Sequence, residues 1–215
     1  TAGGTPVKLE VPGEFEYAGK GVSYCAICDG AFFKGHTIIV VGGGDAACEE
    51  ADFLTRYAAK VYLVHRRHAF RASKIVQQRL FANPKIEVVW DTVVEEIVGA
   101  DGLMTHARLK HLPTDSSRDL DATGIFIFVG FKPNTGVIEG HVEHDAAGYL
   151  LTDANMQTSI PGLFAAGDVR VQLTRQVTTA VGDATTAAIA VEKFLTARKS
   201  GQPAPDPVPT LVRGA

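Results

Sequence analysis

Two cysteines separated by two residues and followed directly by a carboxyl side chain form the most reactive pattern in the chain, Cys25-Ala-Ile-Cys28-Asp29. This spacing lets the thiols close a small disulfide, and it lets one thiolate attack a bound partner while the other resolves the mixed disulfide. Asp29 stands where a carboxyl could carry the proton that a leaving thiolate or an attacking thiol requires. The pattern therefore favours thiol–disulfide redox chemistry.

Two other interpretations of the cysteines remain open: buried structural thiols, or half of a zinc site. Cys48 is the one further thiol, and its spacing fits the buried face of a helix, so we expect a small core residue there. The histidines that could complete a tetrahedral site are scattered without ligand spacing: His36, His106, His111, His141 and His144. We therefore predict no metal site, and we expect these histidines, like Trp90, to have no chemical role.

A second pattern, Gly42-Gly43-Gly44-Asp45-Ala46-Ala47, has the form G-x-G-x-x-A. It follows a β-branched run at 37–41 and opens a helix-compatible stretch at 45–59. In that context, backbone N–H groups and the helix N-terminus hold a dinucleotide pyrophosphate. An ordinary glycine turn between a strand and a helix is the alternative.

The next predicted strand, 61–64, ends in a basic cluster of His65, Arg66 and Arg67, with Arg71 one helical turn beyond. At this place an NAD site normally has an Asp or Glu that accepts the ribose 2′-hydroxyl, whereas arginine favours a 2′-phosphate. A solvated basic edge is the alternative. The cluster predicts NADPH in preference to NADH.

These patterns require an α/β fold in which a strand–turn–helix–strand unit is followed by a second helix, capped by Ser73 and ending near Ala82. Partial alternation of apolar and polar residues then predicts an antiparallel meander of four segments, 86–90, 92–98, 103–112 and 119–123. The run 125–129 is continuously apolar, as in a strand buried on both faces, and we expect a domain boundary just before it, near 121–124.

Beyond that boundary the elements are few and resemble part of a sheet. A turn region at 148–151 precedes a second buried strand at 162–166, which Gly167 and Asp168 close. An alanine-rich helix is expected from Gln176 or Gly182 to Arg198, and the proline-rich segment 201–215 is expected to be an unstructured tail.

Composition excludes several functional classes. With 46% hydrophobic and 21% charged residues the chain is that of a globular protein, and a net charge of -3 provides no general attraction for nucleic acid or an anionic membrane. No apolar run reaches the length of a membrane span, and residues 1–9 lack the features of a secretion signal. We expect a cytoplasmic protein.

Read in order, six segments of the chain closely resemble low-molecular-weight thioredoxin reductase: 25–30, 41–45, 49–51, 65–71, 130–135 and 158–169. The resemblance runs from Thr1 to about Ala197. It implies a homodimeric flavoprotein that uses NADPH and FAD, with two doubly wound (Rossmann-like) domains, the NADPH domain being inserted into the FAD domain. On this basis residues 1–12 are a hinge and the end of an FAD half, 13–122 the NADPH domain with its meander, and 123–200 the carboxy-terminal part of the FAD domain.

The resemblance also implies roles for individual residues. Cys28 would lie next to the flavin, Cys25 would attack the disulfide of thioredoxin, and Asp29 would be the general acid. The remaining cofactor residues fall into two groups. Those for NADPH are Gly42, Gly43, Gly44, Asp45, Ala46, Ala47, His65, Arg66, Arg67 and Arg71; those for FAD are Gly167, Asp168, Arg175, Gln176 and Val177, with Gly130 as a further cofactor residue.

The chain departs from the family pattern in several places. Ala46 stands where Ser or Thr is usual, Ala184 replaces a common glycine, and Ile27 replaces the more frequent threonine between the cysteines. No second G-x-G-x-x-G precedes Thr1, so we expect the half of the FAD domain that grips the adenosine to be missing. The implied domain rotation places hinges around 1–12 and 122–124.

Three alternative functions each differ from that of a thioredoxin reductase in one feature. The reductase subunit of an alkyl hydroperoxide system shares the dithiol but uses NADH, against which the arginines argue. A ferredoxin or flavodoxin reductase relative lacks the dithiol. A redox-inert NADP-binding module remains the alternative from another class, and it predicts NADPH binding without turnover.

Overall fold

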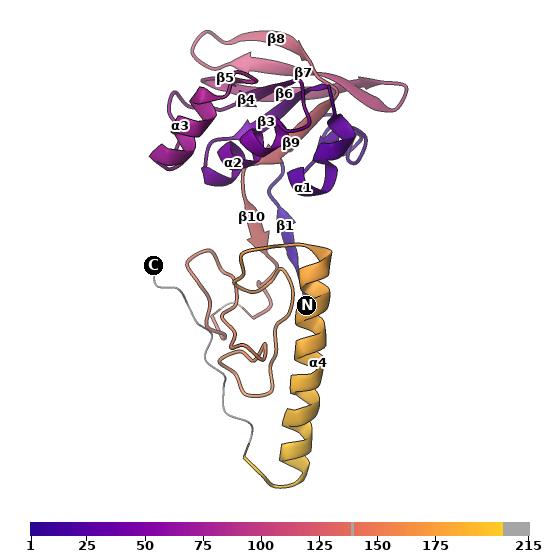
Figure 1. Ribbon diagram of the computed structural model, residues 1–215, viewed down its shortest axis with the longest axis vertical. Coiled ribbons are helices and arrows are strands. Elements are labelled where there is room, and N and C mark those ends of the chain that lie inside the picture. Colours follow the sequence, from indigo (N-terminus) through magenta and orange to yellow (C-terminus); the bar gives the residue numbers. More distant parts are fainter. Residues whose placement is uncertain (139, 204–215) are drawn as a thin grey trace. The chain divides into compact units, whose positions relative to one another are not determined.

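The structure, a computed structural model, describes residues 1–138 and 140–203 (Figure 1). It divides into two compact units, one of residues 6–130 and the other of residues 1–5 together with the chain from 131 onward. Most of the tail expected at 201–215 lies outside the described residues. Within the described residues, no helix is both long and apolar enough to cross a membrane.

A five-stranded parallel sheet forms the centre of the unit 6–130. Its strands lie in the order β2 (Val22–Ser23), β9 (Gly124–Phe128), β3 (Thr37–Gly42), β4 (Lys60–Val64) and β5 (Ile86–Val89). Ile39 of β3 is level with Ile125 on one side and with Tyr62 on the other. The central strands are buried on both faces, which is why 37–42 and 124–128 read as continuous apolar runs.

Alternate residues of β3 enter two different cores. Ile38 and Val40 pack with α2 (Asp45–Leu54) and α3 (Lys74–Ala82), whereas Ile39 and Val41 pack with the second sheet. That second sheet is antiparallel and consists of β6 (Thr92–Ala100), β7 (Leu103–His111) and β8 (Ser116–Asp121). Figure 1 shows the two helices and the antiparallel sheet on opposite sides of the parallel sheet. Burial of each such side chain contributes about 2 kcal/mol, so the β3 run anchors both layers.

Three expectations for this unit need correction. Residues 86–89 are not in the meander, since β5 pairs parallel with β4; alternation alone does not distinguish the two kinds of pairing. The helix expected over 45–59 is α2, which ends at Leu54. Beyond it the N–H groups of residues 55–57 donate to carbonyls three residues back and not four, for example from Tyr57 N–H to Leu54 O, so the α-helix does not continue to Ala59. The division between the units falls after Gly130 and not near 122, since β9 fills the place between β2 and β3.

The second unit contains β10 (Phe131–Pro133) and the long helix α4 (Val177–Lys199). β10 pairs with β1 (Gly4–Pro6), and a small core gathers Val142, Leu150, Ala165 and Val169. Of the two predicted starts, Gln176 and Gly182, the helix has the first: it begins after Gln176, with a capping box formed with Thr179.

The buried strand expected at 162–166 does not form. Its backbone hydrogen bonds go to the neighbouring segment 156–158, for example from Ala165 N–H to Met156 O, and they amount to one isolated bridge between Gln157 and Phe164. The segment is nevertheless buried at Ala165 and Ala166, which accounts for its apolar sequence.

Candidate functional site

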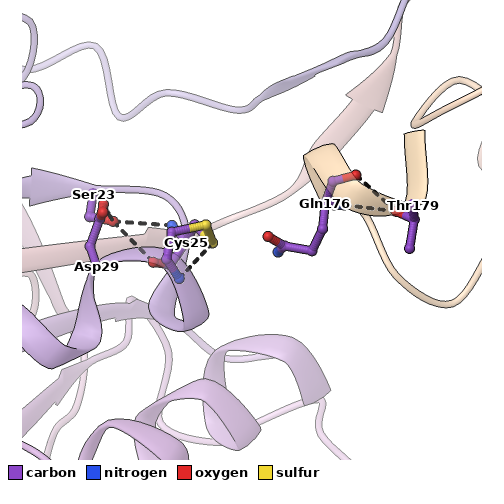
Figure 2. Close-up of a disulfide and its surroundings, with 6 residues drawn as sticks. Ser23, Cys25, Asp29, Gln176 and Thr179 are labelled. Carbon is purple, nitrogen blue, oxygen red and sulfur yellow. Dashed lines mark hydrogen bonds between the residues drawn. A yellow bond between two sulfur atoms is a disulfide. The ribbon is translucent and has the colours of Figure 1, made fainter. Parts of the chain in front are cut away.

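Cys25 and Cys28 are joined in a disulfide at the start of a short helix, α1 (Ala26–Asp29), which continues into the 3-10 turn η1 (Gly30–Phe33). Their Cα atoms are 5.3 Å apart. Cys25 is the N-cap of α1, and its Sγ accepts the backbone N–H of Cys28 at 3.1 Å (Figure 2). Cys28 is exposed and Cys25 half-buried. A donor aimed at Cys25 Sγ stabilises negative charge on that sulfur when the disulfide is reduced.

Asp29 closes the same turn, where its N–H donates to Cys25 O at 3.1 Å. Its carboxyl accepts a 2.6 Å hydrogen bond from the hydroxyl of Ser23, a buried residue of β2. The structure thus brings the three predicted catalytic residues onto one turn. Ser23 was not predicted; it ends the two-residue strand β2, and its closeness to Cys25 in the sequence does not by itself indicate a bond to Asp29.

Tyr24, which was also not predicted, connects the turn that carries the disulfide (residues 25–29, the disulfide turn) to the chain that precedes it. The hydroxyl of Tyr24 donates to Glu14 Oε1 at 2.7 Å, and the ammonium of Lys8 lies 3.3 Å from the centre of the Tyr24 ring. Burial, followed by the hydrogen bond to Glu14, raises the pKa of Tyr24 well above its usual value of 10.0. Tyr24 is therefore a hydrogen-bond donor throughout the physiological pH range.

The glycine turn lies between β3 and α2, as expected. Gly42 has a positive φ of 154°, and a Cβ there would collide with Ala47 and the Phe128 carbonyl. A Cβ on Gly43 would collide with the ring of His65, whereas at Gly44 it would meet open space. The first two glycines thus serve close packing, and the third leaves room for a ligand at the helix N-terminus.

The basic loop that follows β4 is fastened to the glycine turn by backbone contacts. Arg71 N–H donates to Gly43 O at 2.8 Å, and Ser73 N–H donates to the carboxylate of Asp45 at 2.8 Å. The hydrogen bonds from Ser73 lower the pKa of Asp45. Of the predicted alanines, Ala47 is buried under the turn and Ala46 is exposed.

The four predicted residues of the basic cluster occupy two environments. Arg66, Arg67 and Arg71 are exposed, and within the described residues none of them forms an ion pair with a carboxylate. His65 is buried, with its Nε2 3.1 Å from Ala69 O and its ring against Phe70 and Trp90. Desolvation lowers the pKa of His65, so the positive charge of the cluster comes from the arginines.

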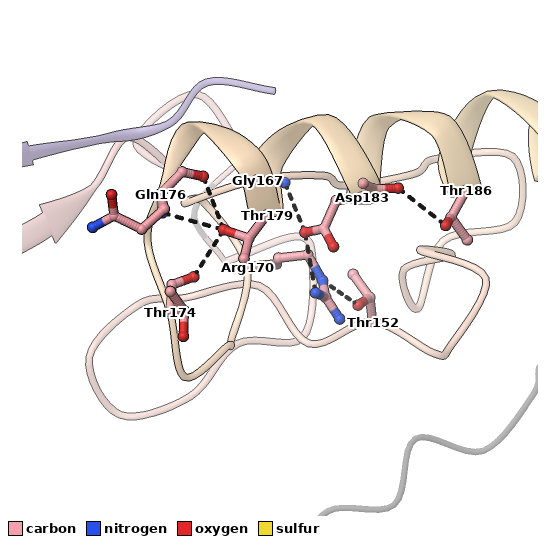
Figure 3. A network of polar contacts seen from close by, with 9 residues as sticks. Thr152, Gly167, Arg170, Thr174, Gln176, Thr179, Asp183 and Thr186 are labelled. Atoms are coloured by element: carbon pink, nitrogen blue, oxygen red, sulfur yellow. Dashed lines mark hydrogen bonds and ion pairs between the residues drawn. The ribbon is translucent and has the colours of Figure 1, made fainter.

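In the second unit, the turn at Gly167 is held by the start of helix α4. Gly167 has a positive φ of 79°, and its N–H donates to Asp183 Oδ2 at 3.0 Å. The same oxygen accepts from Arg170 Nη1 at 3.1 Å, while Arg170 Nε donates to Thr152 Oγ1 at 2.9 Å (Figure 3). Asp183 and Arg170 were not predicted, because Asp183 is sixteen residues from Gly167 and their contact exists only in the folded chain.

The predicted flavin residues lie in this turn and directly after it. Two of them, Asp168 and Arg175, have a polar atom buried without a partner, and so does Gln172, which was not predicted. Among the described residues the atoms concerned are Asp168 Oδ1, Gln172 Nε2 and Arg175 Nε. The guanidinium of Arg175 lies 4.1 Å from the centre of the Tyr149 ring. Gln176 caps α4, and Val177 is exposed on its first turn, as is Ala184 about two turns later.

The other singled-out residues have structural places. Cys48 lies on the buried face of α2, so the expectation of a small core residue is confirmed, and burial raises the pKa of its thiol to about 11. Gly130 ends the unit 6–130, where its carbonyl accepts from Val7 N–H at 2.9 Å. Among residues 1–138 and 140–203, no three metal-ligating side chains converge.

Comparisons with known proteins agree on one family. The family model described as pyridine nucleotide-disulphide oxidoreductase matches residues 1–184. The thioredoxin reductase of Peptoclostridium litorale is 47% identical over 199 residues, a match that covers 90% of this chain and 63% of that protein. The thioredoxin reductase of Rickettsia felis is 48% identical over 190 residues, covering 87% of this chain and 61% of that protein.

Among solved structures, the thioredoxin reductase from Streptococcus pyogenes MGAS5005 matches with a TM-score of 0.88 at 48% identity, covering 91% of this chain and 64% of that one. The chain therefore spans less than two thirds of the length of these relatives. The region that the family model matches includes the disulfide turn, the glycine turn and the basic loop. The chain belongs to the pyridine nucleotide-disulphide oxidoreductase family, and the three relatives named above are thioredoxin reductases.

Proposed function

We propose that this chain supplies the NADPH-binding and dithiol part of a flavoenzyme that reduces the disulfide of thioredoxin or of a similar small dithiol protein. The observation that carries the proposal is the Cys25–Cys28 disulfide with Asp29 on the same turn, in the same unit as the glycine turn and the arginine loop. The thioredoxin reductases among its relatives support the choice of substrate. A homodimer in the cytoplasm is part of the same proposal.

NADPH fits the residues of the unit 6–130. The open space at Gly44 and the first N–H groups of α2 would receive the pyrophosphate. Arg66, Arg67 and Arg71, which are exposed and free of carboxylate partners among the described residues, would surround the 2′-phosphate. Buried His65 would support the loop beneath them, through Ala69 O and the close packing at Gly43.

FAD fits the turn 167–177 of the second unit, which we infer is part of a doubly wound FAD domain. The partnerless atoms of Asp168, Gln172 and Arg175 require hydrogen-bond partners, which the ribityl hydroxyls and the ring edge of a flavin would provide. When bound, NADPH and FAD supply hydride transfer and deliver two electrons to the Cys25–Cys28 disulfide. The chain's own residues bind these groups and carry out the exchange with the partner.

The exchange itself has two steps. Cys25 thiolate attacks one sulfur of the partner disulfide, whose S–S bond breaks and releases a thiolate that takes a proton from Asp29. Cys28 then gives up its thiol proton and attacks Cys25 Sγ, which re-forms their disulfide and breaks the mixed disulfide; the second partner sulfur leaves with its electron pair and takes up that proton. Two electrons pass from the chain to the partner, and each partner sulfur gains one proton.

A trapping experiment tests the assignment of the thiols. The reduced Cys28→Ser variant, mixed with oxidised thioredoxin, is expected to give a stable mixed disulfide that intact mass spectrometry detects. Cys25→Ser should give none, and the matched control Cys48→Ser should behave like the unmodified chain because Cys48 is buried in the core. A mixed disulfide formed by Cys25→Ser alone would reverse the two roles.

A visible absorption spectrum before and after anaerobic NADPH tests the cofactors. Flavin bands that bleach on addition of NADPH are expected for protein that holds both groups. A colourless protein that binds NADPH and forms no mixed disulfide with thioredoxin would be a redox-inert NADP-binding module, and the proposal would then be wrong.

A further inference from the structure

The hydroxyl of Ser23 lies between the carboxyl of Asp29 and the backbone of Cys25 (Figure 2). Ser23 Oγ is 2.6 Å from Asp29 Oδ2, to which it donates, and it accepts the N–H of Cys25 at 3.1 Å. A hydroxyl has one proton to give and two lone pairs, so both bonds form together. The Cys25 carbonyl, at 3.3 Å, is a poorer acceptor for the same proton because it is farther away.

The surroundings hold this hydroxyl in place. Ser23 is only 4% exposed and ends β2, where it is level with Phe126 of the buried strand β9. Asp29 sits one helical turn after Cys25, fixed by its own N–H bond to Cys25 O. One oxygen atom therefore ties the carboxyl and the first cysteine to the rigid parallel sheet.

A cavity of about 360 Å³ opens beside this pair. Ser23 and Asp29 line it, together with Lys20, His36, Met104 and Thr123. It gives solvent a path to the carboxyl, through which a proton donated to a thiolate can be replaced. The hydrogen bond from Ser23 engages Asp29 Oδ2, so the other carboxyl oxygen, Oδ1, is the one left to carry the transferred proton.

We propose that Ser23 is the positioning residue for Asp29, and that its hydroxyl orients the carboxyl that returns a proton to the leaving thiolate. The proposal rests on the proposed function, in which Asp29 is the general acid. In each exchange the Cys25 thiolate forms a new S–S bond, the bond within the disulfide substrate breaks, and the departing sulfur takes its electron pair and one proton. Ser23 forms and breaks no covalent bond.

Two small disulfides separate this role from a merely structural one. The aromatic thiolate released from dithiobis-nitrobenzoate is a good leaving group and departs without a proton, whereas the alkyl thiolate released from bis-hydroxyethyl disulfide benefits from a proton donor. The full 215-residue chain is reduced with excess dithiothreitol, freed of it by gel filtration, and mixed with each disulfide in a stopped-flow instrument. The readout is the ratio of the alkyl rate to the aromatic rate.

Ser23→Ala is expected to lower this ratio roughly tenfold, the effect of losing one hydrogen bond to a charged group. Ser23→Thr should retain most of the ratio and Ser23→Val should lose it, although the two side chains have the same shape. Thr92→Val is the matched control, since it removes another buried hydroxyl, which bonds Trp90 O, and should leave the ratio unchanged. Circular dichroism verifies folding, and the Thr and Val pair decides the question if Ser23→Ala does not fold.

The variant Asp29→Asn separates the general-acid role of Asp29 from the positioning role of Ser23. If Asp29→Asn leaves the ratio unchanged, the general-acid role in the proposed function fails. If Asp29→Asn lowers the ratio while Ser23→Ala and Ser23→Val do not, Asp29 keeps its role and the inference about Ser23 is overturned. A fall in both rates by the same factor in Ser23→Val would also overturn it, because that result reports a displaced turn and no change in proton transfer.

Discussion

The hydroxyl of Tyr24 donates a 2.7 Å hydrogen bond to Glu14 Oε1, which fastens the residue before Cys25 to the segment that leads into the unit. Glu14 is only 4% exposed, and its carboxylate also accepts the N–H groups of Leu9 and Glu10, at 3.1 and 2.7 Å. Three donors thus compensate for the burial of one carboxylate. The connecting segment and the disulfide turn are held together as one hydrogen-bonded block.

We predict that Tyr24→Phe lowers the free energy of unfolding by roughly 2 kcal/mol at neutral pH, because it leaves the buried carboxylate short of a donor. The pKa of Tyr24 is raised in the folded protein, so the wild-type advantage is fully present below the unfolded pKa of about 10 and declines as the pH rises above it. Urea titrations at neutral and strongly alkaline pH measure the difference. Tyr57→Phe is the control, and a pH-independent difference would contradict the account.

We predict that the arginines of the basic loop make the protein bind NADPH, with its 2′-phosphate, more tightly than NADH. Replacing Arg66 and Arg67 together by Ala should weaken NADPH binding on the order of a hundredfold, the loss of two charge-assisted hydrogen bonds, and should change NADH binding little. Titration of nucleotide fluorescence gives both dissociation constants. Arg79→Ala is the matched control, since Arg79 lies on α3 and faces Glu49. Equal losses for both nucleotides would remove the 2′-phosphate assignment.

We predict that His65, which lies under the basic loop, makes the stability of the protein fall at mildly acidic pH. Burial lowers the pKa of His65, so the folded protein holds it neutral while the unfolded chain binds a proton below its usual pKa of about 6.5. Its contribution to stability is therefore present above that value and is lost as the pH falls below it. Thermal unfolding between neutral and mildly acidic pH should show this loss in the unmodified chain and a smaller one in His65→Gln. The exposed neighbour His68 provides the control His68→Gln, and an identical pH dependence in His65→Gln would exclude His65 as the cause.

Sequence patterns predicted those parts of the site whose residues are close together in the chain. The disulfide turn, the glycine turn and the order of β3, α2, β4 and α3 all depend on short spacings, and the structure has them. What the patterns missed depends on contacts between distant residues. β5 alternates like a meander strand but is drawn into the parallel sheet by β4, and β9 returns to lie between β2 and β3.

The polar partners were missed for the same reason. Glu14 is ten residues from Tyr24 and Asp183 is sixteen from Gly167, and each is identified by a hydrogen bond that exists only in the folded chain. Ser23 is close to Cys25 in sequence, yet nothing in its type distinguishes a hydroxyl that bonds a carboxyl from one that simply ends a strand.

Asp183 provides the last prediction, because one of its oxygens holds both the Gly167 N–H and the guanidinium of Arg170. The two side chains of the ion pair are only 11% and 13% exposed. Asp183→Asn keeps an acceptor for Gly167 but leaves Arg170 as an uncompensated charge, so it should cost about 3 kcal/mol of stability in the second unit. Combining it with Arg170→Gln should cost less than the sum of the single changes, since the uncompensated charge is removed. Hydrogen exchange at the Gly167 amide should become faster in Asp183→Asn. Glu192→Gln, on the exposed side of the same helix, is the control and should leave the exchange rate unchanged. An unchanged exchange rate in Asp183→Asn would mean that the turn carrying Asp168 is held by other contacts.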